Sequence, residues 1–176
     1  IGDNYFQSFT IVADVDTGEN NKLIFGEVEG ELGKDFIPYS FSGNADVDAE
    51  IIFVGYGFDI NKDTFQWTDY EGMDVKDKWV LILRVEPELD STNSVFVPFS
   101  NVRGKILTAK DKGAAGVLTV SSVGMERRDK LVSLYYDKTS SRAGLPVINI
   151  TRNLANKILS NTEQTIEDLE KEINES

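Results

Sequence analysis

Four short apolar runs, each bounded by polar residues, constrain the fold of this chain more than any other feature of its sequence. They lie at 50–55, 78–84, 115–120 and 145–150. Continuous apolar runs of this length, rich in β-branched and aromatic residues, are typical of strands that are buried on both faces. The runs therefore predict the strands of a buried sheet rather than a half-exposed ribbon.

Two helical segments lie among these strands, and a third follows them. Segment 102–113 repeats its apolar residues on one helical face and is preceded by Ser100 and Asn101, either of which can cap it. Segment 151–159 opens on a good N-cap residue, and 166–173 is amphipathic but acidic. Strands interleaved with helices in this order predict a β-rich α/β domain.

The chain contains no histidine and no cysteine among its 176 residues. Disulfides, thiol catalysis and Ser-His-Asp or Cys-His catalysis are therefore excluded for this segment. Zinc sites nearly always use an imidazole or a thiolate, so the composition also argues against a zinc enzyme within it. We expect no catalytic site and no cofactor in this chain.

The formal net charge is −12, which opposes nucleic-acid phosphates and anionic membranes. No apolar run approaches the roughly 20 residues that a membrane helix needs. One segment, 102–130, runs against the trend, with seven bases and three acids for a local charge of +4. It is either the solvated face of a helix or a docking face for an acidic partner.

A loop-like segment resembles the start of a calcium-binding loop. Asp59, Asn61 and Asp63 stand at the alternating positions where such loops place oxygen ligands. The glycine and glutamate that the loop needs further on are replaced by Thr64 and Tyr70. The sequence leaves two readings open, a loose calcium site and a solvated turn rich in Asp and Asn.

Aromatic residues gather near the same segment. Tyr56, Trp67 and Tyr70 combine an apolar ring with a polar handle, a combination that is favoured at interfaces. Together with Asp69 they form the candidate contact surface of this chain. The alternative is that the rings pack beneath the loop as part of the core.

Several pieces of the chain, taken in order, resemble one family. GYG at 55–57, WTDYEGMDV at 67–75 and KWVLIL at 78–83 are followed by KILTAKDKGAAGVL at 105–118 and LPVINI at 145–150. This series resembles the protease-associated (PA) domains that are inserted in co-catalytic zinc aminopeptidases. The chain departs from the family pattern at Lys-Asp-Lys, where Lys-Gly-Lys is usual, and in a small insertion after Ile60.

The resemblance implies a fold and a division of the chain. A PA-like fold is an open β-barrel or sandwich flanked by short helices. Residues 36–160 would form that domain, 1–35 an N-terminal arm from a peptidase domain, and 161–176 a helical linker back to it. The aromatic and β-branched run at 5–12 predicts a strand within the arm.

The resemblance also implies a role. PA domains of this family lie beside the active-site cleft, and their proposed roles are limiting substrate access, influencing substrate choice and contacting partners. The family's zinc would belong to the peptidase domain of the same polypeptide, and none of its metal or catalytic residues maps onto this chain. The family resemblance further implies an extracytoplasmic protein, whether periplasmic, cell-surface or secreted.

Two other functions fit the same residues. The chain could be the PA domain of a subtilisin-like protease or of a sorting receptor. It could also be a stand-alone module that binds a peptide or a glycan through Trp67, Tyr70 and Tyr56. A peptide or protein substrate is thus an expected partner, whereas nucleic acid is not.

Overall fold

The computed structural model describes residues 15–88, 93–134 and 141–175. The predicted strand at 5–12 lies outside these residues. Within them, the four apolar runs form the strands of one sheet, and the expected β-rich α/β class is confirmed.

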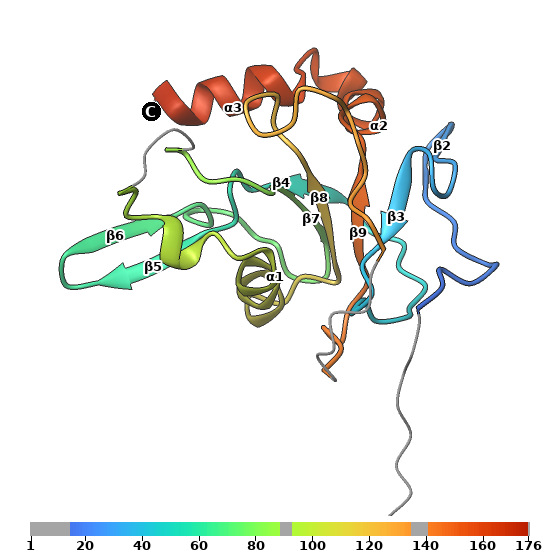
Figure 1. Cartoon of the computed structure of the whole chain (residues 1–176), viewed down its shortest axis with the longest axis horizontal. Helices are drawn as coiled ribbons and strands as arrows, with labels where there is room; N and C mark the ends of the chain where they lie inside the picture. Colours follow the sequence, from blue (N-terminus) through green and yellow to red (C-terminus); the bar gives the residue numbers. More distant parts are fainter. Residues whose placement is uncertain (1–14, 89–92, 135–140, 176) are drawn as a thin grey trace, which may run out of the picture.

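The main sheet has five strands in the order β3-β9-β8-β7-β4 (Figure 1). β4, β7, β8 and β9 are parallel neighbours, and only β3 is antiparallel. The strands span Phe36–Pro38 (β3), Ile51–Phe53 (β4), Trp79–Leu83 (β7), Gly116–Val120 (β8) and Val147–Ile150 (β9). The central strands β7 and β8 are buried along their whole length, which agrees with their unbroken apolar sequence.

Helices cover the two faces of this sheet (Figure 1). α1 (Val102–Asp111) packs Ile106 and Ala109 against one face. α2 (Arg152–Ile158) and α3 (Ile166–Glu175) pack against the other face, together with the sheet residues of the larger core cluster. The domain therefore has three layers, with the sheet in the middle.

The helix ends follow the capping chemistry that the sequence predicts. Asn101 Oδ1 accepts a hydrogen bond from the backbone N–H of Arg103 at 2.8 Å, so of the two candidate caps Asn101 is the one used. Thr151 Oγ1 accepts from the N–H of Leu154 at 3.2 Å and begins α2. Gly113, with a φ of +89°, follows α1 in the conformation that ends helices.

Two small antiparallel ribbons complete the sheet structure. β1 (Ile24–Phe25) pairs with β2 (Val28–Glu29), and β5 (Asp59–Lys62) pairs with β6 (Phe65–Thr68). Short 3₁₀ turns lie at Val97–Phe99 (η1) and Leu159–Thr162 (η2). The β5–β6 ribbon connects β4 to β7, in a segment that the sequence suggested was a loop.

The segments predicted as arm and linker pack against the domain where they are described. Leu23, Phe25 and Val28 lie against the larger core cluster. At the other end, Ile166 of α3 is fully buried, and the Tyr56 hydroxyl donates to Asn174 Oδ1 at 2.7 Å. The folded body thus extends beyond the predicted boundaries of 36 and 160, since apolar side chains on both segments are buried in its core.

Gly116 allows a close approach between neighbouring strands. A Cβ built on Gly116 would lie 2.4 Å from Cζ3 of Trp79, so the indole ring lies across the glycine backbone. This contact fixes the position of Trp79 at the amino end of β7.

Replacing Gly116 with alanine is expected to lower the free energy of unfolding by about 1–3 kcal/mol, because the added methyl must displace a buried ring. Gly104 is the matched control: it lies inside α1, and a Cβ there has no atom within 4 Å. Alanine at Gly104 is expected to raise the free energy of unfolding by about 0.5–1 kcal/mol. Urea unfolding of both variants measures the contrast, and equal effects would contradict this account of Gly116.

Candidate functional site

The structure places the predicted contact residues mainly in the core. Tyr56 is 1% exposed and Tyr70 is 5% exposed. Trp67 and Asp69 are half-buried, and the Trp67 ring stands edge-on to Phe96 with centroids 5.1 Å apart. Two of the four residues therefore lie inside the domain rather than on its surface, since Tyr56 belongs to the larger core cluster and Tyr70 to the core cluster on the α1 face.

Asp69 is the polar centre of this cluster. Its Oδ2 accepts a hydrogen bond from the backbone N–H of Phe58 at 2.7 Å, and its Oδ1 accepts from Trp67 Nε1 at 2.8 Å. Burial raises the pKa of the Asp69 carboxyl, although these two donors and Lys105 act in the opposite direction. The carboxylate thus holds the ribbon against the turn that follows β4.

Lys105, which the sequence analysis did not single out, lies beneath the same cluster and is 1% exposed. Its Nζ donates to the carbonyl oxygens of Leu83, at 3.2 Å, and Val85, and lies 4.4 Å from the ring centroid of Phe58. Burial lowers the pKa of Lys105 to about 7. A sequence signal did exist, since Lys105 follows Val102 by three positions on the apolar face of α1.

The two tyrosines of the cluster differ in their polar contacts. Tyr56 hydrogen-bonds Asn174, whereas the Tyr70 hydroxyl is buried without a hydrogen-bond partner among the described residues. Burial raises the pKa of Tyr56 to about 12 and also raises the pKa of Tyr70. Both phenols are therefore protonated at neutral pH.

The three candidate calcium ligands lie on or just after a regular strand. Asp59 and Asn61 belong to β5, whose alternation points both away from the buried Ile60. Side chains two residues apart in a strand are separated by roughly 7 Å, whereas calcium draws its oxygen ligands to within about 2.5 Å of one centre. Asp59 is instead paired with Lys112 Nζ at 2.6 Å, a contact that lowers the pKa of its carboxyl.

Zinc does not fit the donor set of this chain. The sequence supplies no imidazole and no thiolate. Across residues 15–88, 93–134 and 141–175, no three acidic side chains come together in a group that could hold a metal ion.

Most of the basic side chains on and next to α1 contact groups of their own domain. Lys105 is buried, Lys110 Nζ donates to the Ala143 carbonyl at 2.7 Å, and Lys112 pairs with Asp59. The guanidinium of Arg103 lies 4.7 Å from the ring centroid of Phe41. The local positive charge of 102–130 therefore gives little free cationic surface on this helix.

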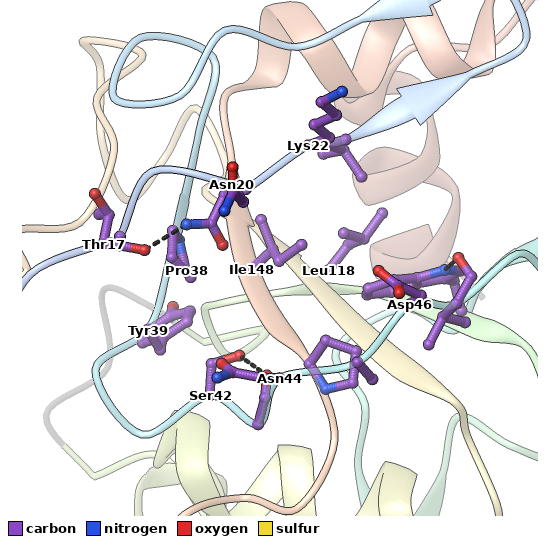
Figure 2. Close-up of a pocket in the computed structure, with 18 of the residues that line it drawn as sticks. Thr17, Asn20, Lys22, Pro38, Tyr39, Ser42, Asn44, Asp46, Leu118 and Ile148 are labelled. Atoms are coloured by element: carbon purple, nitrogen blue, oxygen red, sulfur yellow. Dashed lines mark hydrogen bonds between the residues drawn. The ribbon is translucent and has the colours of Figure 1, made fainter.

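A hollow lies on the opposite face of the sheet from α1 (Figure 2). We call it the sheet groove, and its floor is formed by one apolar residue from each parallel strand. These residues are Ile51 (β4), Trp79 (β7), Leu118 (β8) and Ile148 (β9). Its volume is about 1270 Å³, and the chain at 16–26 and 42–49 forms its walls.

Comparison with known proteins establishes the fold. No protein-family model and no curated protein matches the sequence. Among solved structures, an aminopeptidase from Aneurinibacillus sp. strain AM-1 is similar over 81% of this chain, with a TM-score of 0.50 and 20% sequence identity. The chain spans about a quarter of that protein, 26% of its length. At this identity the likeness shows a shared fold.

The sequence predicts no membrane-spanning helix, because no apolar run is long enough. No helix in the described part of the chain is both long enough and apolar enough to cross a bilayer.

Proposed function

We propose that the chain is a non-catalytic protease-associated domain that works beside the peptidase domain of a zinc aminopeptidase. The observation that carries this proposal is the fold: the chain matches about a quarter of an aminopeptidase over most of its own length. The motif series from Gly55 to Ile150 supports the same family.

The chemistry of the residues agrees with an accessory role. The half-buried Asp69 and the buried Lys105 bind backbone groups of their own domain. Neither lines the sheet groove. A domain of this kind acts on access to, or choice of, the peptide substrate, and we place it outside the cytoplasm on the family resemblance.

A direct assay tests the non-catalytic part of the proposal. The purified chain, supplied with zinc and leucine p-nitroanilide, is expected to release no p-nitroaniline above the buffer rate. Zinc-dependent release that disappears on chelation would refute it.

Reading the gene on both sides of the encoded segment tests the host. Histidine and aspartate zinc ligands downstream are expected. A Ser-His-Asp triad would instead favour a subtilisin-like protease, and a membrane anchor without a peptidase domain would favour a sorting receptor.

A further inference from the structure

We propose that the chain forms a symmetric dimer in which strand β4 of one copy pairs antiparallel with β4 of a second copy. The pairing would join two five-stranded sheets into one continuous sheet. This inference goes beyond the accessory role proposed above and does not depend on the catalytic host. The interaction surface is the outer edge of β4, which no strand of the described chain covers.

This outer edge presents backbone groups that no other described segment binds. On the inner side, the Glu50 carbonyl accepts from the N–H of Trp79 on β7 at 2.8 Å. Backbone groups of successive residues in a strand point to opposite edges, so those of Ile51 and Phe53 point outward. Within the described residues, no hydrogen bond joins these outward N–H and C=O groups to another segment. Such an edge is a template for a further strand.

The opposite edge of the same sheet is closed. The Phe36 N–H on β3 donates to the Glu31 carbonyl at 3.4 Å, and the Phe36 carbonyl accepts from the N–H of Gly33 at 2.8 Å. Pro38, the last residue of β3, has no N–H to offer. β4 reads Ile-Ile-Phe and contains neither proline nor a charge. Because proteins usually protect their sheet edges in such ways, an open apolar edge indicates a partner strand.

The exposure of β4 lies along its edge, because both of its faces are covered. Ile51 and Phe53 pack against the larger core cluster, and Ile52 packs against the core cluster on the α1 face. All three are nevertheless only half-buried, whereas the central strands β7 and β8 are buried at every position. The uncovered surface of β4 is therefore the side on which a further strand would lie.

The outward groups of β4 are self-complementary, which identifies the partner as a second copy. They belong to the two residues that flank Ile52. A two-fold axis through Ile52 therefore sets Ile51 opposite Phe53 of the second copy, and Phe53 opposite Ile51 of the second copy. Two residues opposed in this way exchange two N–H···O=C bonds, so the pairing uses every outward group of both strands.

The same register keeps like charges apart and limits the length of the contact. Glu50 lies opposite Val54 of the second copy, so no two acidic side chains face each other. Gly55, with a φ of +66°, departs from strand geometry and ends the pairing, which spans residues 50–54. Because this contact is short, we expect a dissociation constant on the order of 10–100 µM.

Sedimentation velocity of the 176-residue chain tests the dimer. Between about 5 µM and about 1 mM, the weight-average mass is expected to rise from near that of one chain towards that of two. Each copy carries a formal charge of −12, so raising sodium chloride from about 50 to about 500 mM is expected to strengthen the dimer severalfold by screening repulsion. A chain that stays monomeric at the highest concentration in both salts would overturn the proposal.

A single cysteine tests the register, because the sequence contains no other thiol. The two copies of Ile52 would form a non-hydrogen-bonded pair with Cα atoms about 4.5 Å apart, within the range of a disulfide. Ile52→Cys is therefore expected to give a covalent dimer with oxidised glutathione, which is reduced to two glutathione molecules as the two thiols join. Ile51→Cys is the matched control, since its Cα atoms lie roughly 8–9 Å apart in this register. Equal cross-linking at the two positions, or none at Ile52, would reject the pairing.

Proline at Ile51 tests the outward backbone groups. It removes an outward N–H from each copy and leaves the bonds to β7, whereas Ile51→Ala removes the same apolar packing and keeps the N–H. Ile51→Pro is expected to weaken the dimer at least about tenfold relative to Ile51→Ala, because two of its four bonds are lost. Circular dichroism shows whether each variant is folded. Equal dimerisation of two folded variants would contradict the use of this edge, and the cysteine pair decides the question if the proline variant does not fold.

Discussion

Replacing Asp69 with alanine is expected to lower the free energy of unfolding by about 3–4 kcal/mol. The carboxylate accepts from two donors, the Phe58 backbone N–H and Trp67 Nε1, and alanine leaves both without their acceptor. Each buried polar group that loses its partner costs about 1–3 kcal/mol. Lys105 also loses the acidic group that most favours its charged form.

Two further variants test the cause of this loss. Asparagine at Asp69 keeps one acceptor oxygen, so Asp69→Asn is expected to cost about half as much as alanine. Asp63→Ala serves as the matched control, because Asp63 is exposed after β5 and its loss is expected to stay within about 0.5 kcal/mol of wild type. Urea unfolding at neutral pH measures all three. Similar costs at Asp69 and Asp63 would contradict the central position of Asp69.

Coupling between Asp69 and Lys105 gives a sharper measurement. The double variant Asp69→Asn/Lys105→Met is expected to be more stable than the sum of its single changes predicts, because it removes two opposite charges that interact electrostatically. Interaction energies of about 0.5–3 kcal/mol are usual for such neighbours. Strict additivity would show that the two side chains act independently.

The second large effect concerns pH. The free energy of unfolding is expected to rise between about pH 7 and pH 9. Burial lowers the pKa of Lys105 from its ordinary value of 10.5 to about 7. Between those two pKa values the unfolded chain binds a proton that the folded chain has released. The free energy of unfolding therefore increases with pH, by at most about 1.4 kcal/mol per pH unit.

The composition of the chain simplifies the pH dependence of stability between pH 7 and pH 9. Histidine and cysteine, which would also titrate there, are absent from the sequence. The neutral amine of Lys105 still has two hydrogens for the carbonyls of Leu83 and Val85, so deprotonation removes the buried charge and keeps both hydrogen bonds. A gain of about 2 kcal/mol from pH 7 to pH 9 is expected.

Titration of the tyrosines limits the pH range over which the free energy of unfolding increases. Because burial raises the pKa of Tyr56 to about 12, the unfolded chain loses this phenolic proton before the folded chain does. The free energy of unfolding is therefore expected to fall again above about pH 10. Urea titrations at intervals of one pH unit locate the maximum.

Lys105→Met tests the assignment. The variant is expected to lose the rise between pH 7 and pH 9, and to be less stable than wild type at pH 9, where the two carbonyls lack their donor. Lys62→Met, at an exposed position of β5, is expected to keep the rise. A rise of the same size in the Lys105 variant would assign the titration to another group.

Local sequence patterns predicted the elements of this fold closely. The run at 78–84 became β7 and the run at 115–120 became β8, because continuous apolar residues leave a strand no solvent-facing side. Helix 102–113 became α1, with Asn101 as its cap. Such features depend on neighbours a few residues away, which the sequence displays directly.

The ribbon β5–β6 differs from the loop that the sequence suggested. Asp59, Asn61 and Asp63 have the spacing of a metal loop, yet the pairing of Ile60 with Trp67 makes the first two part of a strand. Pairing between two segments depends on tertiary contacts. Here that pairing gives an extended backbone where the sequence suggested a loop. Of the two alternatives for Tyr70, a contact surface or packing in the core, the structure shows the second.

What the sequence determined by itself is the class of the domain and its lack of histidine and cysteine chemistry. Only the tertiary structure decided the contacts between distant residues. Tyr56 reaches Asn174 across 118 positions, and Lys105 meets the carbonyls of Leu83, at the end of β7, and Val85. The sheet groove likewise depends on the order of four parallel strands, which brings Ile51 and Ile148 onto one floor. Composition and periodicity describe a residue's preference for burial, whereas strand order and register decide which residues it meets.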